Sequence, residues 1–356
     1  MKTKLVYVLT CAPEANYIEQ ALMSVWSARH WNPDAHIVLI TDNLTDQLFV
    51  GKRAEILDYI SEKIVIPFED DSLSMVYRSR WLKTSVRQLI KGDFLFIDCD
   101  TIVCKSLVEV DSFDKEICAV RDSNVDFKDD NSRDVTCSLI LKLGVDADKE
   151  MYHFSSGVIF VKDTLTTHKF YDRWHQNWIY SFSLSIAIDQ PSLAKTDIEF
   201  GHIISCINDQ YNSVFYTQDV NLTNSSILHL CVPKNTCLLY TKSSFKIVRS
   251  EGIVPWAKQL ILNIHSTYLP FDYWIKHSSF SQRLYWVRSI SRMLKLYGQN
   301  VGGYYSQINF KIGANKIIIL LLRLHLYRLA MSCWMIWKRL QLKYTKRILK
   351  ANICHC

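Results

Sequence analysis

Apolar residues in the first half of the chain fall into two patterns that follow one another repeatedly. Short runs rich in β-branched residues predict strands, and longer segments with apolar residues three or four positions apart predict helices. The strands are expected at residues 4–10, 36–43, 63–68, 94–98 and 152–162, and the helices at 16–30, 74–91 and 164–180. Strands that alternate with helices indicate a largely parallel, covered sheet. Ligands of such sheets bind at the carboxyl ends of the strands.

One of the predicted strands ends in two carboxylates. Residues 94–103 read FLFIDCDTIV. Because side chains of a strand alternate between its faces, we expect Asp98 and Asp100 to point to one side and Cys99 to point into the fold. Two like charges this close raise the pKa of one group, and a hard divalent cation, which prefers oxygen ligands, removes the repulsion. The stretch therefore suggests a cation site.

The helix predicted before this strand carries basic residues opposite its apolar face. Arg80, Lys83 and Arg87 have the spacing of one side of a helix. The helix must run antiparallel to the strand that follows it. The helix from Lys83 to Lys91 is roughly 13 Å long, and the strand from Phe94 to Asp98 is roughly 16 Å long. Its first turns therefore lie near Asp98. Such bases form either a salt-bridge cluster or a site for a diphosphate that also contacts the cation.

Charge is distributed unevenly along the 356 residues. Residues 271–356 hold 15 of the 42 Lys and Arg residues and one of the 35 Asp and Glu residues, a net charge of +14 there and −7 in the remainder. We predict two regions, a body at 1–270 and a basic helical extension at 271–356. Such an asymmetry suggests that the extension binds anionic lipid or another polyanion.

The basic extension contains an apolar segment long enough to span a bilayer, at residues 317–337. Arg323, His325 and Arg328 interrupt it, and each mid-helix Arg costs about 2.5–3.5 kcal/mol on insertion scales. We therefore expect an amphipathic helix on the surface of an anionic membrane. The alternative is a helical subdomain that packs on the body or on a partner.

The order of several short motifs in residues 1–270 resembles retaining nucleotide-sugar glycosyltransferases of the GT-A fold, in the broad group around family 8. SRWLKTSVRQLIKGDFLFIDCDTIV looks like that group's helix running into its DxD strand, and FSSGVIFV resembles the next motif, in which Ser155 stands where Asn is usual. DQPSL, INDQYN and SILHL resemble three later elements of the group, in the same order. The ordered set, and no single motif, carries the resemblance.

The resemblance implies a metal site and a donor site. Mn²⁺ or Mg²⁺ would be held by Asp98, Asp100 and His229, with His265 as the competing third ligand, and this mixed ligand set suits Mn²⁺ slightly better. The donor's phosphates would contact Lys83, with Arg80 as the second candidate. The implied contacts of the nucleoside are Thr10, Cys11 and Tyr17, and those of the donor sugar are Ser156, Gly157, Asp189 and Gln190.

Asp189 and Gln190 are the expected catalytic residues, with Asp209–Gln210 as the competing pair. Asp189 would bind hydroxyls of the sugar or the acceptor, and Gln190 would lie beneath the anomeric carbon. Asp189 is also a residue type that ordinarily caps a helix N-terminus, which is the structural alternative. Retention can proceed through a carboxylate nucleophile or by front-face attack, and the sequence identifies no nucleophile.

The predicted function is that of a metal-dependent, hexosyltransferase-like enzyme in polysaccharide biosynthesis. It would move a sugar from a nucleotide-sugar donor, UDP-linked, to a saccharide or lipid-linked acceptor with retention. Eleven cysteines without a CxxC pair indicate a reducing compartment, so we expect a cytoplasmic protein, peripheral on the inner face of the membrane.

Parts of the sequence also agree with two other functions. A haloacid-dehalogenase-like phosphatase also carries DxDxT after a strand, but Ile102 replaces the Thr here. A non-catalytic membrane-associated binding protein would use the basic extension alone. Lys and Arg patches also bind nucleic acid, but the aromatic face of the extension favours membrane, and no nucleic-acid partner is expected.

Overall fold

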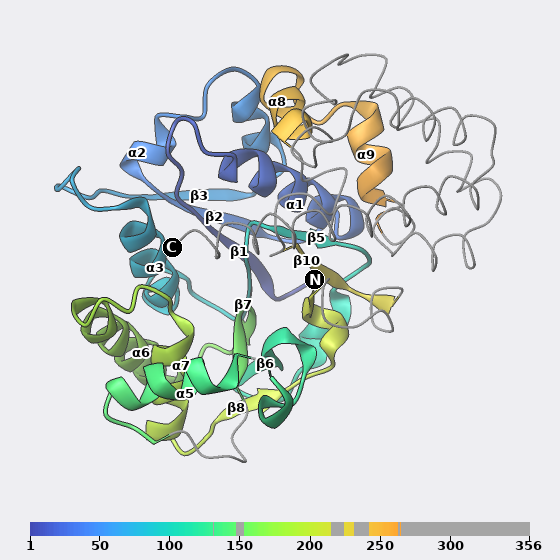
Figure 1. The fold of residues 1–356 in the computed structure, drawn as a ribbon. Helices are drawn as coiled ribbons and strands as arrows, with labels where there is room; N and C mark the ends of the chain where they lie inside the picture. The colour runs from blue at the N-terminus through green and yellow to red at the C-terminus, as the bar shows by residue number, and fades with distance from the viewer. Residues whose placement is uncertain (131, 147–152, 215–223, 231–241, 263, 265–356) are drawn as a thin grey trace, which may run out of the picture. The chain divides into compact units, whose positions relative to one another are not determined.

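The computed structural model describes residues 1–130, 132–146, 153–214, 224–230, 242–262 and 264. In this part of the chain, a seven-stranded central sheet has the order β3-β2-β1-β4-β7-β6-β8, and a second sheet has the order β5-β10-β9 (Figure 1). Helices pack around the central sheet, so the fold is mixed α/β, as predicted.

The strands have the following bounds: β1 Lys4–Leu9, β2 Ile37–Asp42, β3 Glu62–Ile66, β4 Phe94–Ile97, β5 Thr101–Val103, β6 Ile117–Arg121, β7 Phe154–Val161, β8 Ile204–Cys206, β9 Ser213–Val214 and β10 Ile227–His229. The α-helices are α1 Tyr17–Trp31, α2 Asn43–Asp46, α3 Met75–Thr84, α4 Val86–Leu89, α5 Arg133–Lys142, α6 Leu165–Ser183, α7 Gln190–Glu199, α8 Lys242–Glu251 and α9 Pro255–Leu262. All five predicted strands are present.

The central sheet is mostly parallel. β3, β2, β1 and β4 run the same way, which places the carboxyl ends of β1 and β4 at one edge. β7 runs antiparallel to both β4 and β6, while β8 is parallel to β6. The apolar pattern predicted β7 as a strand but not its direction, because side-chain alternation is the same in both directions.

The strands β1, β2, β4 and β7 bury side chains on both faces of the sheet. On one face, Phe94 and Phe96 of β4 join a core with Leu82 of α3, Trp174 of α6 and other apolar side chains. On the other face, α1 lies against the sheet, and its Ser24 hydroxyl donates to Tyr7 of β1 over 3.4 Å. Both faces are therefore covered, which is the condition that allows a parallel sheet to be stable.

The single helix predicted at 74–91 is two helices, α3 and α4, that meet at Ser85. Ser85 Oγ donates to the carbonyl of Trp81 and Thr84 Oγ1 to that of Arg80, four residues back in each case. Such bonds compete with the backbone and often bend a helix. Arg87 consequently does not join Arg80 and Lys83, and it pairs with Asp163 at 3.4 Å.

The predicted basic extension at 271–356 lies outside the described residues, as does His265. None of the helices in the described part of the chain combines the length and hydrophobicity that crossing a bilayer requires.

Candidate functional site

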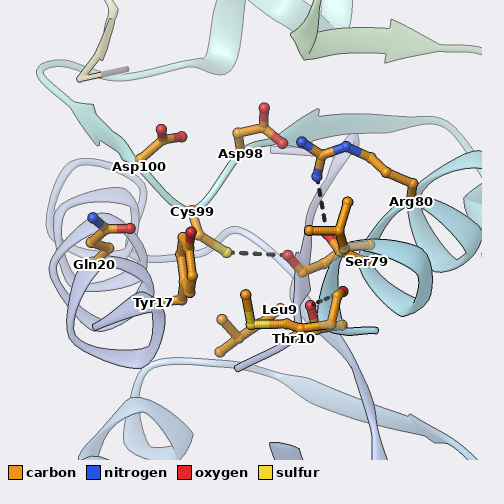
Figure 2. A pocket seen from close by; sticks show the side chains of 12 residues that line it. Leu9, Thr10, Tyr17, Gln20, Ser79, Arg80, Asp98, Cys99 and Asp100 are labelled. Carbon is orange, nitrogen blue, oxygen red and sulfur yellow. Dashed lines mark hydrogen bonds between the residues drawn. The ribbon is translucent and has the colours of Figure 1, made fainter. Parts of the chain in front are cut away.

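The two carboxylates lie in a tight turn between two strands. β4 ends at Ile97 and β5 begins at Thr101, whose hydroxyl donates to the carbonyl of Asp98 over 2.9 Å. Asp98, Cys99 and Asp100 all line one pocket at the carboxyl end of β1 (Figure 2). Cys99 turns away from the two carboxylates, as predicted: its Sγ donates to the carbonyl of Val8 in β1 over 3.2 Å, and burial raises the pKa of its thiol. Asp98 and Asp100 lie on the other side of the turn (Figure 2).

The second sheet brings His229 to this turn. β10 pairs antiparallel with β5, which sets His229 opposite Thr101, and the amide of Leu230 donates to the carbonyl of Asp100 over 2.8 Å. His229 Nε2 then lies 3.1 Å from Asp100 Oδ1. The register of this short strand pair is thus what places an imidazole beside the two carboxylates.

Asp98, Asp100 and His229 each offer a ligand atom, and these atoms lie within 4.8 Å of one another. Two carboxylate oxygens and an imidazole nitrogen form a donor set that binds Mn²⁺, Mg²⁺ or Zn²⁺ in proteins. The residues present therefore fit a divalent cation.

The electrostatics of the three residues point the same way. Burial raises the pKa of Asp98, even with Lys83 beside it, and Asp100 adds to the rise. His229 lowers the pKa of Asp100 against the effect of burial, and Asp100 in turn raises that of His229. Without a cation, His229 compensates the charge of Asp100, and Lys83 that of Asp98. A bound cation would take over that role.

Lys83 is buried behind the carboxylates. Its Nζ lies 3.2 Å from Asp98 Oδ1, 3.1 Å from Ser156 Oγ and 3.1 Å from Asp189 Oδ2. An ammonium group has three donors, so these three partners satisfy it. The side chain is only 3% exposed, and Lys83 is not among the residues that line the pocket.

Arg80, one turn earlier on α3, does line the pocket. Its Nε lies 3.0 Å from Asp189 Oδ1, and about a third of the side chain, 33%, is exposed. Asp189, mainly, raises the pKa of Arg80, with weaker contributions of the same sign from Asp98 and Asp100. Figure 2 shows the guanidinium facing the side of the pocket where Asp98 lies. Arg80 is thus the cation that a ligand in the pocket would meet.

Asp189 is held by two basic residues of α3, Arg80 and Lys83. It precedes α7 at the N-cap position, yet its side chain makes no capping bond. Burial raises the pKa of Asp189, but Lys83, Arg80 and a hydrogen bond with Ser156 more than offset this, so that the pKa falls well below its usual range. The carboxylate is ionised at neutral pH. Gln190 follows as the first residue of α7 and is partly exposed.

The remaining predicted residues divide into two groups. Thr10 and Tyr17 line the pocket, whereas Cys11 is buried, and its amide donates a hydrogen bond to the Thr45 hydroxyl over 2.8 Å. Ser156 and Gly157 lie in β7, behind the carboxylates. A side chain on Gly157 would collide with His229 Cε1 and lie 3.0 Å from Asp98 Oδ2.

The competing Asp–Gln pair has other partners. Asp209 Oδ2 lies 3.1 Å from Arg121 Nη2, and Gln210 Oε1 accepts a hydrogen bond from Lys105 over 3.3 Å. In contrast, Asp189 shares Lys83 with Asp98. Lys83 therefore connects Asp189 of the first pair to the carboxylate turn.

The sequence pattern missed several residues that line the pocket. Gln20 lies one turn after Tyr17 on α1, and Met75, Val76 and Ser79 share a face of α3 with Arg80. Helical spacing from Tyr17 and Arg80 would have indicated them. Asn212 belongs to the INDQYN motif, but its contact with His229 was not predicted, because that contact depends on tertiary structure.

No protein-family model matches the sequence, and no curated protein sequence matches it either. Solved structures of similar shape include the galactosyltransferase LgtC with donor and acceptor sugar analogues, at 15% identity, 65% of this chain, 88% of that chain and a TM-score of 0.45. Mouse xyloside xylosyltransferase 1 is similar at 12% identity, 65% and 99% coverage and a TM-score of 0.45. The glycosyltransferase GlyE of Streptococcus pneumoniae TIGR4 is similar at 16% identity, with 74% of this chain and 63% of that chain covered and a TM-score of 0.46. These TM-scores are all below 0.5, and the function proposed below rests on the pocket itself.

Proposed function

We propose that this chain is a metal-dependent glycosyltransferase of the GT-A type that uses a nucleoside diphosphate sugar, UDP-linked. The acceptor is a saccharide or a lipid-linked saccharide. The observation that carries the proposal is the cluster of Asp98, Asp100 and His229 at the edge of a pocket that also exposes Arg80. A cation site beside an exposed guanidinium is suited to a diphosphate, which binds metal and Arg together.

Each residue of the cluster has a role in this proposal. Asp98, Asp100 and His229 hold the cation, and Mn²⁺ or Mg²⁺ bound there would supply a Lewis acid for the leaving diphosphate. Arg80 adds a fixed positive charge where negative charge develops on the phosphate. Lys83 holds Asp98 and Asp189 in place from behind. This reverses the order of Lys83 and Arg80 as candidates for the phosphate contact.

Asp189 is proposed to orient hydroxyls of the donor sugar, with Gln190 beside it. Both carboxylate oxygens of Asp189 are already engaged, Oδ1 by Arg80 Nε at 3.0 Å and Oδ2 by Lys83 Nζ at 3.1 Å, so neither is placed to attack a sugar carbon. We therefore propose that retention follows front-face attack and not a covalent intermediate on Asp189.

The phosphatase alternative is not favoured, because His229 completes a cluster of three possible metal ligands with the two carboxylates.

The peripheral membrane location stays a prediction, since residues 271–356 lie outside the described part of the chain. Vesicle pelleting of the chain with and without these residues checks it. Loss of binding to anionic vesicles on deletion is the expected result, and continued binding contradicts it.

A screen of nucleotide sugars for hydrolysis and transfer tests the proposed function. The purified chain should release nucleoside diphosphate from at least one UDP-sugar when Mn²⁺ is present, and EDTA should stop the release. Asp98→Asn keeps the size of the side chain but removes an anionic ligand, so turnover should fall by at least about 100-fold. Turnover that is equal with and without the metal would contradict the proposal.

A further inference from the structure

Behind the candidate metal cluster, a chain of hydrogen bonds runs from His229 to the strand β7. His229 Nδ1 lies 2.9 Å from Asn212 Oδ1, and Asn212 Nδ2 donates to Ser155 Oγ over 2.9 Å. The amide of Gly157 also donates to Ser155 Oγ, over 3.3 Å. All four residues are buried. None of the four residues lines the pocket, and the sequence motifs assigned no role to Asn212 or Ser155.

We propose that Asn212 is the positioning residue that fixes the ring orientation and tautomer of His229, and that Ser155 anchors Asn212. The proposal rests on the function proposed above. Ser155 Oγ accepts a hydrogen bond from Asn212 Nδ2, so the other end of the amide, Oδ1, faces His229. An oxygen there can only accept, which places the hydrogen of the imidazole on Nδ1. Nε2, on the side of Asp100, is the nitrogen left for a cation.

Such a partner matters because an imidazole has two nitrogens and can rotate about its bond to Cβ. Metal-binding histidines commonly donate their second N–H to a neighbouring acceptor, and removal of that acceptor typically costs 10- to 100-fold in metal affinity. Here the acceptor is an uncharged amide. It fixes the ring without adding a third negative charge to a site that already has Asp98 and Asp100.

The backbone around Asn212 has supports that do not involve its side chain. The Asn124 side chain donates to the carbonyl of Asn212 over 3.0 Å, and β9, which begins at Ser213, pairs with β10. Substitution of the side chain at 212 therefore leaves the segment in place. The position of Ser155 also gives a function to the serine at a place where the resemblance leads one to expect asparagine.

The test measures Mn²⁺ binding in the presence of UDP. Electron paramagnetic resonance monitors it as the loss of the signal of free Mn²⁺. Asn212→Leu removes the acceptor and should weaken Mn²⁺ binding by about 10- to 100-fold. Asn212→Asp keeps an oxygen opposite Nδ1 and should restore binding to within a few-fold of the wild-type chain. Asn177→Leu is the matched control, because this buried amide bonds Thr196 and Glu199 between α6 and α7; it should leave binding unchanged.

A second readout separates ring orientation from general damage. Long-range ¹H–¹⁵N spectra of histidine-labelled protein, assigned with a His229→Gln variant, should show hydrogen on Nδ1 of neutral His229. A wild-type chain with hydrogen on Nε2, or Asn212→Leu that binds Mn²⁺ as tightly as wild type, overturns the inference alone. A wild-type chain that binds no Mn²⁺ overturns the proposed function and this inference together.

Discussion

At the scale of single residues, Gly157 sets how closely two of the proposed metal ligands, Asp98 and His229, can approach β7. Its carbonyl accepts the amide of Asp98 over 2.8 Å, which continues the pairing of β4 and β7 by one residue. The face of the strand at Gly157 is filled by the ring of His229 and the carboxylate of Asp98. A glycine is needed here for space, because no Cβ fits between the strand and the imidazole.

Gly157→Ala is therefore predicted to impair the metal site more than the fold. The new Cβ would collide with His229 Cε1 and lie 2.8 Å from Nδ1, so the ring must move away from its position. We expect Mn²⁺ affinity to fall by at least about tenfold, with about 1–3 kcal/mol lost from the free energy of unfolding. Metal titration and chemical denaturation measure the two effects.

Val158→Ile is the control for this substitution. Val158 is the next residue of the same strand, buried on the opposite face, and the change also adds one methylene. It should lower stability without changing Mn²⁺ affinity. Equal metal affinity in Gly157→Ala and in the wild-type chain would show that the ring of His229 is not fixed by this contact.

At the scale of elements, α6 and α7 are joined through one carboxylate at the end of α7. Glu199 accepts from Arg173 over 2.8 and 2.9 Å, accepts from Asn177 over 2.8 Å, and pairs with Lys195 at 2.8 Å. The hydrogen bonds from Arg173 lower the pKa of Glu199 to about 2, with Lys195 and Asn177 adding to the effect. The junction supports α7, whose first turn follows Asp189.

Glu199→Gln is predicted to destabilise the chain in a pH-dependent way. The folded pKa of about 2 lies below the ordinary value of 4.5, so the contribution of Glu199 is complete above that ordinary value and is lost as pH falls toward the folded value. The variant should lose about 1–2 kcal/mol at neutral pH. In urea denaturation, the gap to wild type should close on acidification.

The exposed Glu69 provides the comparison for this junction. Glu69→Gln should show no comparable loss at any pH. If Glu199→Gln instead destabilises equally at neutral pH and near pH 2.5, the hydrogen-bonded carboxylate is not what joins α6 and α7.

The sequence predicted those helices and strands whose formation depends on residues close together in the chain. Period and composition predicted β1, β2, β3, β4 and β7, because buried strands and amphipathic helices have a pattern within a few residues. The break at Ser85 was missed, since it depends on whether two hydroxyls bond the backbone. The opposite directions of Cys99 and the two carboxylates were predicted correctly, because alternation is a local property of the chain.

At the scale of the whole molecule, the site combines segments that are far apart in sequence. Asp100 and His229 are 129 positions apart and meet only because β10 returns to pair with β5. The resemblance of the ordered motifs predicted His229 as a ligand. It did not predict that Arg80 lines the pocket and that Lys83 is buried behind it. Helical spacing puts both on one side of α3, and only packing decides which of them is buried.

The measurement that tests the central claim most directly is calorimetric titration of the full chain with UDP, with and without Mn²⁺. The account predicts binding of UDP that depends on Mn²⁺, and its loss in Asp100→Asn, which removes an anionic ligand beside the pocket. If neither UDP nor guanosine diphosphate binds in the presence of Mn²⁺, the cluster of Asp98, Asp100 and His229 is not the metal site of a glycosyltransferase.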